Sequence, residues 1–321
     1  MKPKTTNSLM AYMRDKKGIE ISGSSQKRSL RNMGYFHGYK GYRYCRKPTN
    51  ILRFTDFSEL KAVYDFDMTL KTLIYPKMMF LETALKSYAL ECLIEQSSTE
   101  FFNVIFATSL NDYKAYQTGS KPYRDAVKNR LSVRDQVYRE ISSKYNSSNI
   151  VRHYYDKDKP VPIWAIFELI SLGDFNRLMS CANAQVRTAF SRSIGFNTSL
   201  DPDGKLPNYV IGVLRPLRNS VAHNNPVFDT RFKQGSTKKV GTYLEAVTNV
   251  TGLDFDCIVD YIILIAYMMQ LLKCSKTEIL AFLRGFDTAC DGLRNTVPFN
   301  VYSSIIYTNT RQKLKIFKKS I

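Results

Sequence analysis

Apolar side chains recur every three or four residues along most of this chain. Within residues 57–75, for example, Leu60, Val63, Leu70 and Ile74 follow that spacing, which places them on one face of a helix. No region shows the sustained alternation of apolar and polar residues that is typical of a half-buried strand. The pattern therefore predicts a mainly α-helical protein.

Helices are expected in eleven places. Pro76 should stop or kink the chain between two of them, because proline lacks the backbone donor and clashes with the preceding turn. The apolar run from Tyr261 to Leu272 is twelve residues long, too short to span a bilayer, so we interpret it as a core helix. The expected helices cover residues 5–17, 24–33, 57–75, 77–96, 121–144, 163–172, 174–193, 206–224, 241–250, 254–274 and 276–291.

Positive charge is concentrated at the two ends of the sequence. The chain has 321 residues and a formal net charge of +19, and residues 1–53 and 300–321 together carry +16 of it. These ends are either solvated tails that aid solubility or surfaces that contact a phosphate backbone. We expect three parts: a basic N-terminal helical segment over 1–55, a helical domain over 56–299 and a basic tail over 300–321.

The spacing of the cysteines and the N-terminal residues indicate the cellular compartment. No two of the six cysteines lie within ten residues of each other, which excludes a C-x-x-C metal or redox pair and is typical of reduced thiols in a cytosolic protein. Residues 1–7 lack the apolar core of a signal peptide. We therefore expect a cytoplasmic protein that has no membrane partner.

A segment rich in tyrosine and glycine follows the second expected helix. Residues 35–44 read YFHGYKGYRY, and glycine at every third or fourth position favours a loop or short strand. Aromatic rings beside cations can stack on bases and contact phosphates. The alternative is a loop whose rings pack onto the protein core, and the sequence leaves both open.

The candidate catalytic residues are Arg218, Asn219 and His223. The chain has three histidines, no two of them at helical spacing, so we expect neither a histidine metal site nor a cofactor. Pro226 disfavours helix at the residue before it, which places His223 in the last turn of the expected helix 206–224. Arg218 precedes it by five residues, roughly 140° around the helix, so its long side chain can reach the same cleft.

These three side chains can act on a phosphodiester. The imidazole can move a proton, the guanidinium can neutralise charge that develops on phosphoryl oxygens, and Asn219 adds a neutral donor. The 2′-hydroxyl of RNA would be the nucleophile, with 2′,3′-cyclic phosphate and 5′-hydroxyl products. The spacing alone is weak, because Arg31 and His37, with five residues between them instead of four, also fall within the tolerated range. Arg218 and His223 are equally compatible with a surface arginine and a helix-capping histidine.

Six segments in order along the chain are similar to one known family. They are 9–21 (LMAY…KGIEI), 30–39 (LRNMGYFHGY), 63–71 (VYDFDMTLK), 81–86 (LETALK), 162–173 (PIWAIFELISLG) and 217–223 (LRNSVAH). Together they resemble the abortive-infection Abi family, the AbiD/AbiF-like group of phage-defence proteins in the HEPN superfamily. Lys71 and Lys86 stand where that family usually has arginine, and Asn224 stands where it usually has a second histidine.

The resemblance implies a HEPN-like helical bundle with a basic N-terminal extension. It implies a ribonuclease in which Arg218 and His223 form the R-x4-H pair with Asn219 beside them. It also implies a homodimer that brings two such motifs to one cleft, and for some relatives a small structured RNA that restrains the protein as an antitoxin.

Three acidic residues are expected to support this site. Asp67 and Glu82 each precede a lysine by four residues, Lys71 and Lys86, so each pair is alternatively a plain surface ion pair worth little. Glu168 lies in an apolar helix, where a buried carboxylate needs a partner. We expect a structural bond to an arginine or backbone group, or a role in orienting Arg218.

We therefore predict a metal-independent endoribonuclease of an abortive-infection or toxin–antitoxin system. The alternative is a non-catalytic RNA-binding or sensor protein of phage defence. The expected partner is RNA, either as substrate or as a small non-coding antitoxin. The residues expected to contact RNA are Arg31, Tyr35, Tyr39, Lys40, Tyr42, Arg43, Lys71, Lys313 and Lys315.

Overall fold

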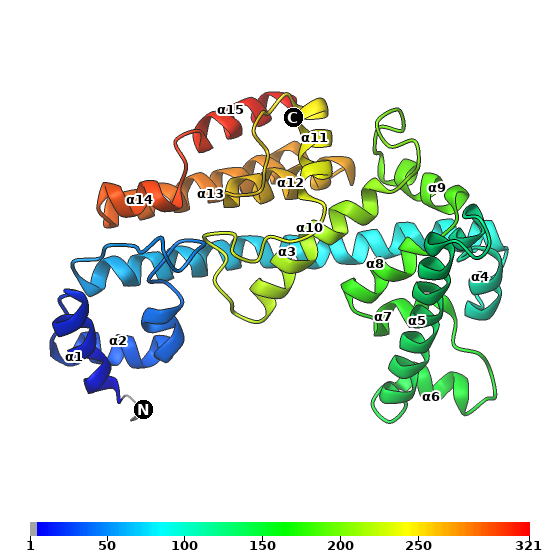
Figure 1. Ribbon diagram of the computed structural model, residues 1–321, viewed down its shortest axis with the longest axis horizontal. Coiled ribbons are helices and arrows are strands. Elements are labelled where there is room, and N and C mark those ends of the chain that lie inside the picture. The colour runs from blue at the N-terminus through cyan, green and yellow to red at the C-terminus, as the bar shows by residue number, and fades with distance from the viewer. Residues whose placement is uncertain (1–4) are drawn as a thin grey trace. The chain divides into compact units, whose positions relative to one another are not determined.

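The computed structural model describes residues 5–321 and is almost entirely helical (Figure 1). Within that range β-structure is limited to three isolated bridges, so the prediction of a mainly α protein is confirmed. The first part of the chain forms α1 (Thr6–Lys17), α2 (Gly23–Tyr35), η1 (Phe36–Lys40), α3 (Phe57–Ser97), α4 (Phe102–Thr108), η2 (Asp112–Ala115), α5 (Lys121–Lys144) and α6 (Asn149–Tyr155). The remainder forms α7 (Ile163–Leu169), α8 (Leu172–Ser180), α9 (Ala184–Ile194), α10 (Leu206–Ala222), α11 (Thr237–Thr248), α12 (Ile258–Leu271), α13 (Lys276–Thr296), α14 (Phe299–Ile305) and α15 (Thr310–Ser320).

The chain divides into two compact units. Unit 1 comprises the chain up to Met78 together with Pro216–Ile321, and unit 2 comprises Met79–Arg215. This division differs from the three parts expected from the charge pattern, because the basic N-terminal helices and the C-terminal helices belong to the same unit. The first four residues of the basic N-terminal segment lie outside the described range.

Unit 1 is built around α12, which is buried on every side. Each residue from Ile258 to Met269 is buried, as expected for a helix that is apolar all round. α12 packs against α13 and α15, and α15 also packs against α11 and α13 (Figure 1). Residues 300–321 are therefore not a solvated tail: α15 buries Leu314 and Phe317 in this core. Within residues 5–321 we find no helix with the length and apolarity that a bilayer crossing demands.

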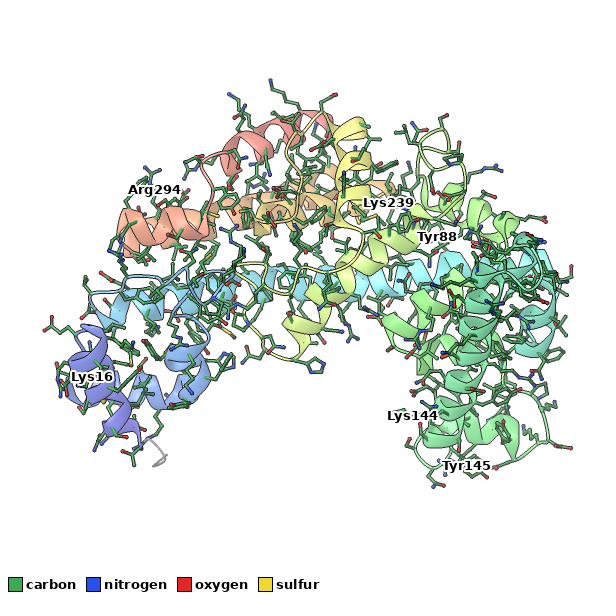
Figure 2. All side chains as sticks on the ribbon, in the orientation of Figure 1. Lys16, Tyr88, Lys144, Tyr145, Lys239 and Arg294 are labelled. Atoms are coloured by element: carbon green, nitrogen blue, oxygen red, sulfur yellow. The ribbon has the colours of Figure 1, made fainter. Side chains whose placement is uncertain are left out.

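Unit 2 is organised around α5, which contacts η2, α7 and α8. Its buried stripe is Val133, Val137 and Ile141, and the opposite face is polar, as expected for a surface helix. Figure 2 shows Lys144 and Tyr145 at the C-terminal end of this helix, where the Tyr145 hydroxyl donates a hydrogen bond to Asp156. The helix expected over 174–193 is instead two helices, α8 and α9, because the Asn183 side chain accepts from the Val186 N–H and caps a new start.

The expected stop at Pro76 is wrong, because α3 continues through it. Pro76 is exposed, whereas Ile74 and Met78 on either side of it are fully buried. Burial of the apolar face offsets the one hydrogen bond that the proline removes.

The expectation of a loop or strand at 35–44 is wrong for its first half. Gly34 has φ 81°, which ends regular helix at α2, and Phe36–Lys40 then forms one turn of π-helix. A side chain at Gly38 would overlap Cδ1 of Leu30, so Leu30 would have to shift to accommodate it.

A buried ion pair ties α15 to α12. The Lys313 ammonium lies 2.7 Å from Oδ1 of Asp260 and donates to the carbonyl of Gly252 at 2.6 Å. Burial raises the pKa of Asp260 to about 6, although the Lys313 charge opposes that shift. Since only 3% of Lys313 is exposed, the expectation that it contacts RNA is wrong.

Lys313→Met is expected to destabilise the protein by about 3 kcal/mol at pH 8 and by clearly less at pH 5. The change removes the group that lowers the pKa of Asp260, so this pKa rises further above its unfolded value of 3.8. The folded variant then holds a proton that the unfolded chain releases, and stability falls as pH rises from about 4 through the folded pKa. Urea denaturation at both pH values measures this, with the exposed Lys315→Met as control. An equal loss at pH 5 and pH 8 would contradict it.

Candidate active site

The motif residues lie at the C-terminal end of α10. The helix ends at Ala222, and His223 follows as its cap, with its N–H bonded to the Asn219 carbonyl at 2.9 Å. Asn224 has φ 55° and donates to the Val221 carbonyl at 3.2 Å, and Asn225 donates to the Ser220 carbonyl at 2.8 Å. This pair of bonds around a left-handed residue is a Schellman motif, which fixes where the helix stops.

The three candidate side chains are accessible there. Asn219 and His223 are exposed and Arg218 is half-buried. Nη1 of Arg218 lies 3.4 Å from Oδ1 of Asn219, so the guanidinium and the amide are neighbours. His223 follows one turn later, at the end of the helix. The negative end of the helix dipole favours cations there and repels an anionic phosphate, so the positive charge of Arg218 is needed to offset that repulsion. A proton-transfer group and a fixed cation are therefore presented on one helix terminus.

The loop after His223 is attached to α3 through Asp67. This carboxylate is completely buried, and its Oδ1 accepts from the backbone N–H groups of Val227 at 2.7 Å and Phe228 at 2.8 Å. Its Oδ2 accepts from the hydroxyl of Tyr42 at 2.7 Å and lies 2.8 Å from the ammonium of Lys71. Four donors thus surround one carboxylate, which satisfies a buried charge.

Lys71 links the same carboxylate to the residue beside His223. Its Nζ donates to Oδ1 of Asn224 at 2.8 Å, and its side chain is 7% exposed. We refer to Tyr42, Asp67, Lys71 and Asn224 as the Asp67 clasp. The reading of Asp67 and Lys71 as a surface ion pair is wrong, because both are buried. The expectation that Lys71 contacts RNA is wrong for the same reason.

His37 lies next to the clasp as a packed aromatic ring. Its ring is near those of Phe36, Tyr42 and Tyr64, and its Nδ1 is buried with no hydrogen-bond partner among the described residues. Burial lowers the pKa of His37, the nearby Lys71 lowers it further, and Asp67 opposes this. These surroundings favour a neutral imidazole at His37.

The aromatic segment divides into a buried and an exposed part. Tyr39 and Tyr42 are 4% and 0% exposed, so for them the packing alternative is correct and direct RNA contact is wrong. Tyr35 is exposed, and the Lys40 ammonium lies 4.8 Å from the centre of its ring. Of the other residues expected to contact RNA, Arg31 and Lys315 are exposed and Arg43 is half-buried.

Two of the expected supporting residues lie in unit 2. Glu82 pairs with Lys86 at 3.2 Å, each side chain is 13% exposed, and Lys86 also donates to the carbonyl of Ile170 at the end of α7. This pair is largely buried, so the surface reading is wrong for it as well. Glu168 is exposed, so the expectation of a buried carboxylate is wrong for this residue.

The clasp role of Asn224 was not predicted from the sequence, although a signal exists. Asn224-Asn225-Pro226 directly follows a helical segment, and asparagine is the residue after glycine that most readily takes the left-handed position ending a helix. The loop partners of Asp67 gave no local signal, because Val227 lies 160 residues away in sequence. Within residues 5–321, His, Cys, Asp and Glu side chains form no group of three or more placed to hold a metal ion.

The helical fold and this motif can be compared with known families. A family model described as Abi-like protein matches residues 28–229, which include the second half of α2, the Asp67 clasp and the α10 motif. The chain belongs to the Abi-like protein family, and this membership indicates a role in abortive infection, a defence against phage. Searches of curated proteins and of solved structures found no match.

Proposed function

We propose that this chain is a metal-independent RNA endonuclease of the HEPN type that acts as a toxin in phage defence. The observation that carries the proposal is the half-buried Arg218 with the exposed Asn219 and His223 at the capped end of α10, in a chain of the Abi-like family. Arginine and histidine side chains can supply charge neutralisation and proton transfer to a phosphodiester without a bound ion.

In the proposed reaction the 2′-hydroxyl of RNA attacks the adjacent phosphorus. His223 transfers the proton, Arg218 offsets the charge on the pentacoordinate phosphorane, and Asn219 positions the phosphate or the imidazole. The P–O5′ bond breaks, and the 5′-oxygen leaves with a proton. The products are a 2′,3′-cyclic phosphate and a 5′-hydroxyl. A homodimer that brings two motifs together supplies a second imidazole for the second proton transfer.

Cleavage by the purified protein in EDTA tests this proposal. A structured cellular RNA pool is incubated with the protein, and the product ends are mapped by ligation after selective phosphatase treatment. Cyclic phosphate and 5′-hydroxyl ends are the expected result. Uncleaved RNA, with the protein active in neither EDTA nor magnesium, would contradict it. Light scattering at micromolar concentration tests the dimer, and sequencing of co-purified RNA tests for a small RNA antitoxin.

A second candidate function is RNA binding without cleavage. It is favoured by the exposed aromatic and cationic group formed by Arg31, Tyr35 and Lys40, with Phe36 also exposed beside them. Stacking rings and cations are the usual means of holding single-stranded RNA. Binding that persists with no cleavage under any condition would favour this function.

RNA affinity is expected to fall steeply with salt under both functions. With four phosphate contacts, a rise from 50 to 200 mM salt should weaken binding of single-stranded RNA by about 50-fold. Tyr35→Ala should weaken binding by about 5-fold or more at fixed salt, without altering the slope of log affinity against log salt concentration. Lys40→Ala should reduce that slope by the amount expected for one phosphate contact. Fluorescence anisotropy at several salt concentrations measures both. Salt-independent affinity would indicate that the charged surface only aids solubility.

A further inference from the structure

We propose that Lys71 is a positioning residue for His223 and acts through Asn224. This inference rests on the proposed function, since it concerns how the catalytic imidazole is held. Lys71 cannot meet a phosphate, because its ammonium is buried between the Asp67 carboxylate and the Asn224 side chain. Its charge is therefore used inside the protein, at the residue that follows His223.

Asn224 is the point where this hold is applied. It occupies the left-handed position of the Schellman motif, one bond away from the backbone of His223. Lys71 fixes its Oδ1, and Asp67 fixes the backbone three and four residues further along, at Val227 and Phe228. The five residues after His223 are thus attached to α3 at both ends.

These attachments determine the exit of the chain from α10, and so the direction of the His223 side chain. Hydrogen bonds from a buried ammonium are stronger than neutral ones and tolerate little displacement. A displacement of about 1 Å in a catalytic group can cost about 100-fold in rate. Lys71 is buried and is not expected to touch the RNA, so loss of its bond to Asn224 should lower kcat and leave KM unchanged.

Two variants remove the bond from its two sides. Asn224→Gly deletes the acceptor and keeps a residue that adopts φ 55° without strain. Lys71→Met deletes the donor and keeps the length of the side chain. The matched control is Lys61→Met on the same helix, which removes an exposed ion pair with Asp65.

Each clasp variant is expected to lower kcat by about 10- to 100-fold, with KM within about 2-fold of wild type. The double variant should be no slower than Lys71→Met alone, because both changes remove one interaction. Lys61→Met should retain wild-type kcat. Losses that multiply in the double variant, or a rise in KM with constant kcat, would overturn the proposal.

A second readout does not depend on cleavage. The chain has three histidines, so NMR of protein labelled at histidine ring carbons resolves His223 from His37 and His153. In Asn224→Gly the His223 signal should shift and narrow as its ring gains motion, while the His153 signal stays in place. An unchanged His223 signal overturns the positioning role. If the wild-type protein cleaves no RNA but the His223 signal still changes in Asn224→Gly, the positioning role is supported and the ribonuclease proposal is rejected.

Discussion

His223→Ala protein is expected to cleave RNA about 10³-fold more slowly than wild type, and Arg218→Ala protein about 10²- to 10³-fold more slowly. Both should bind RNA with an affinity within a few-fold of wild type. The reason is that the imidazole and the guanidinium act mainly on the transition state, where a proton moves and charge appears on the phosphoryl oxygens. Single-turnover cleavage measured alongside binding separates the two effects.

Folding should be little affected by either change. His223 is exposed, and it contributes to the helix end through its backbone N–H, which alanine retains. The matched controls are His153→Ala, an exposed histidine in the last turn of α6, and Arg284→Ala, an exposed arginine on α13. These controls should keep wild-type rates. Full cleavage by His223→Ala would reject this site, and full cleavage by Arg218→Ala would remove the arginine from it.

The double variant Arg218→Ala/His223→Ala provides a further check. Residues that act together in one transition state do not contribute additively. The double variant should therefore be about as slow as His223→Ala alone. If RNA cleavage causes host toxicity, the variants should lose toxicity in the same order in which they lose cleavage.

The fold was predictable wherever local pattern determines structure. The expected helix 121–144 agrees with α5 at both ends, because Ser120 caps its start and apolar spacing continues to its finish. The α10 helix was expected to end near Pro226, and it ends at Ala222 with a cap that asparagine favours. Where tertiary burial opposed the local signal, as at Pro76, the burial prevailed.

The candidate site was predictable only in part. The motif residues were proposed from their types and spacing, and their placement near a helix end follows from Pro226. The burial of Lys71 and Lys313 was not predictable, because each lysine is neutralised by an aspartate whose depth depends on long-range packing. The net charge of the chain ends therefore overstates their cationic surface, because some of their basic residues, such as Lys313, are buried in ion pairs with aspartates.

Asp67→Ala is expected to have the largest effect on stability of any change in the clasp. It leaves a buried ammonium at Lys71, a buried hydroxyl at Tyr42 and the N–H groups of Val227 and Phe228 without their acceptor. Each unsatisfied buried donor costs about 1–3 kcal/mol, and more if charged. We expect a loss of about 5 kcal/mol or more, which approaches the whole stability of many domains.

Because Asp67→Ala is expected to be near the limit of folding, Asp67→Asn supplies a second measurement. Its amide oxygen can still accept from the two backbone N–H groups, but its NH2 group faces the Lys71 ammonium, so we expect a loss of about 3 kcal/mol. Adding Lys71→Met removes that opposed charge and should recover about 1 kcal/mol. Asp65→Ala, an exposed neighbour on α3, should change stability by less than about 0.5 kcal/mol. Urea denaturation followed by far-UV circular dichroism measures all four proteins. A loss below about 1 kcal/mol for Asp67→Ala would mean that water replaces the carboxylate and that the loop after His223 is held by other contacts.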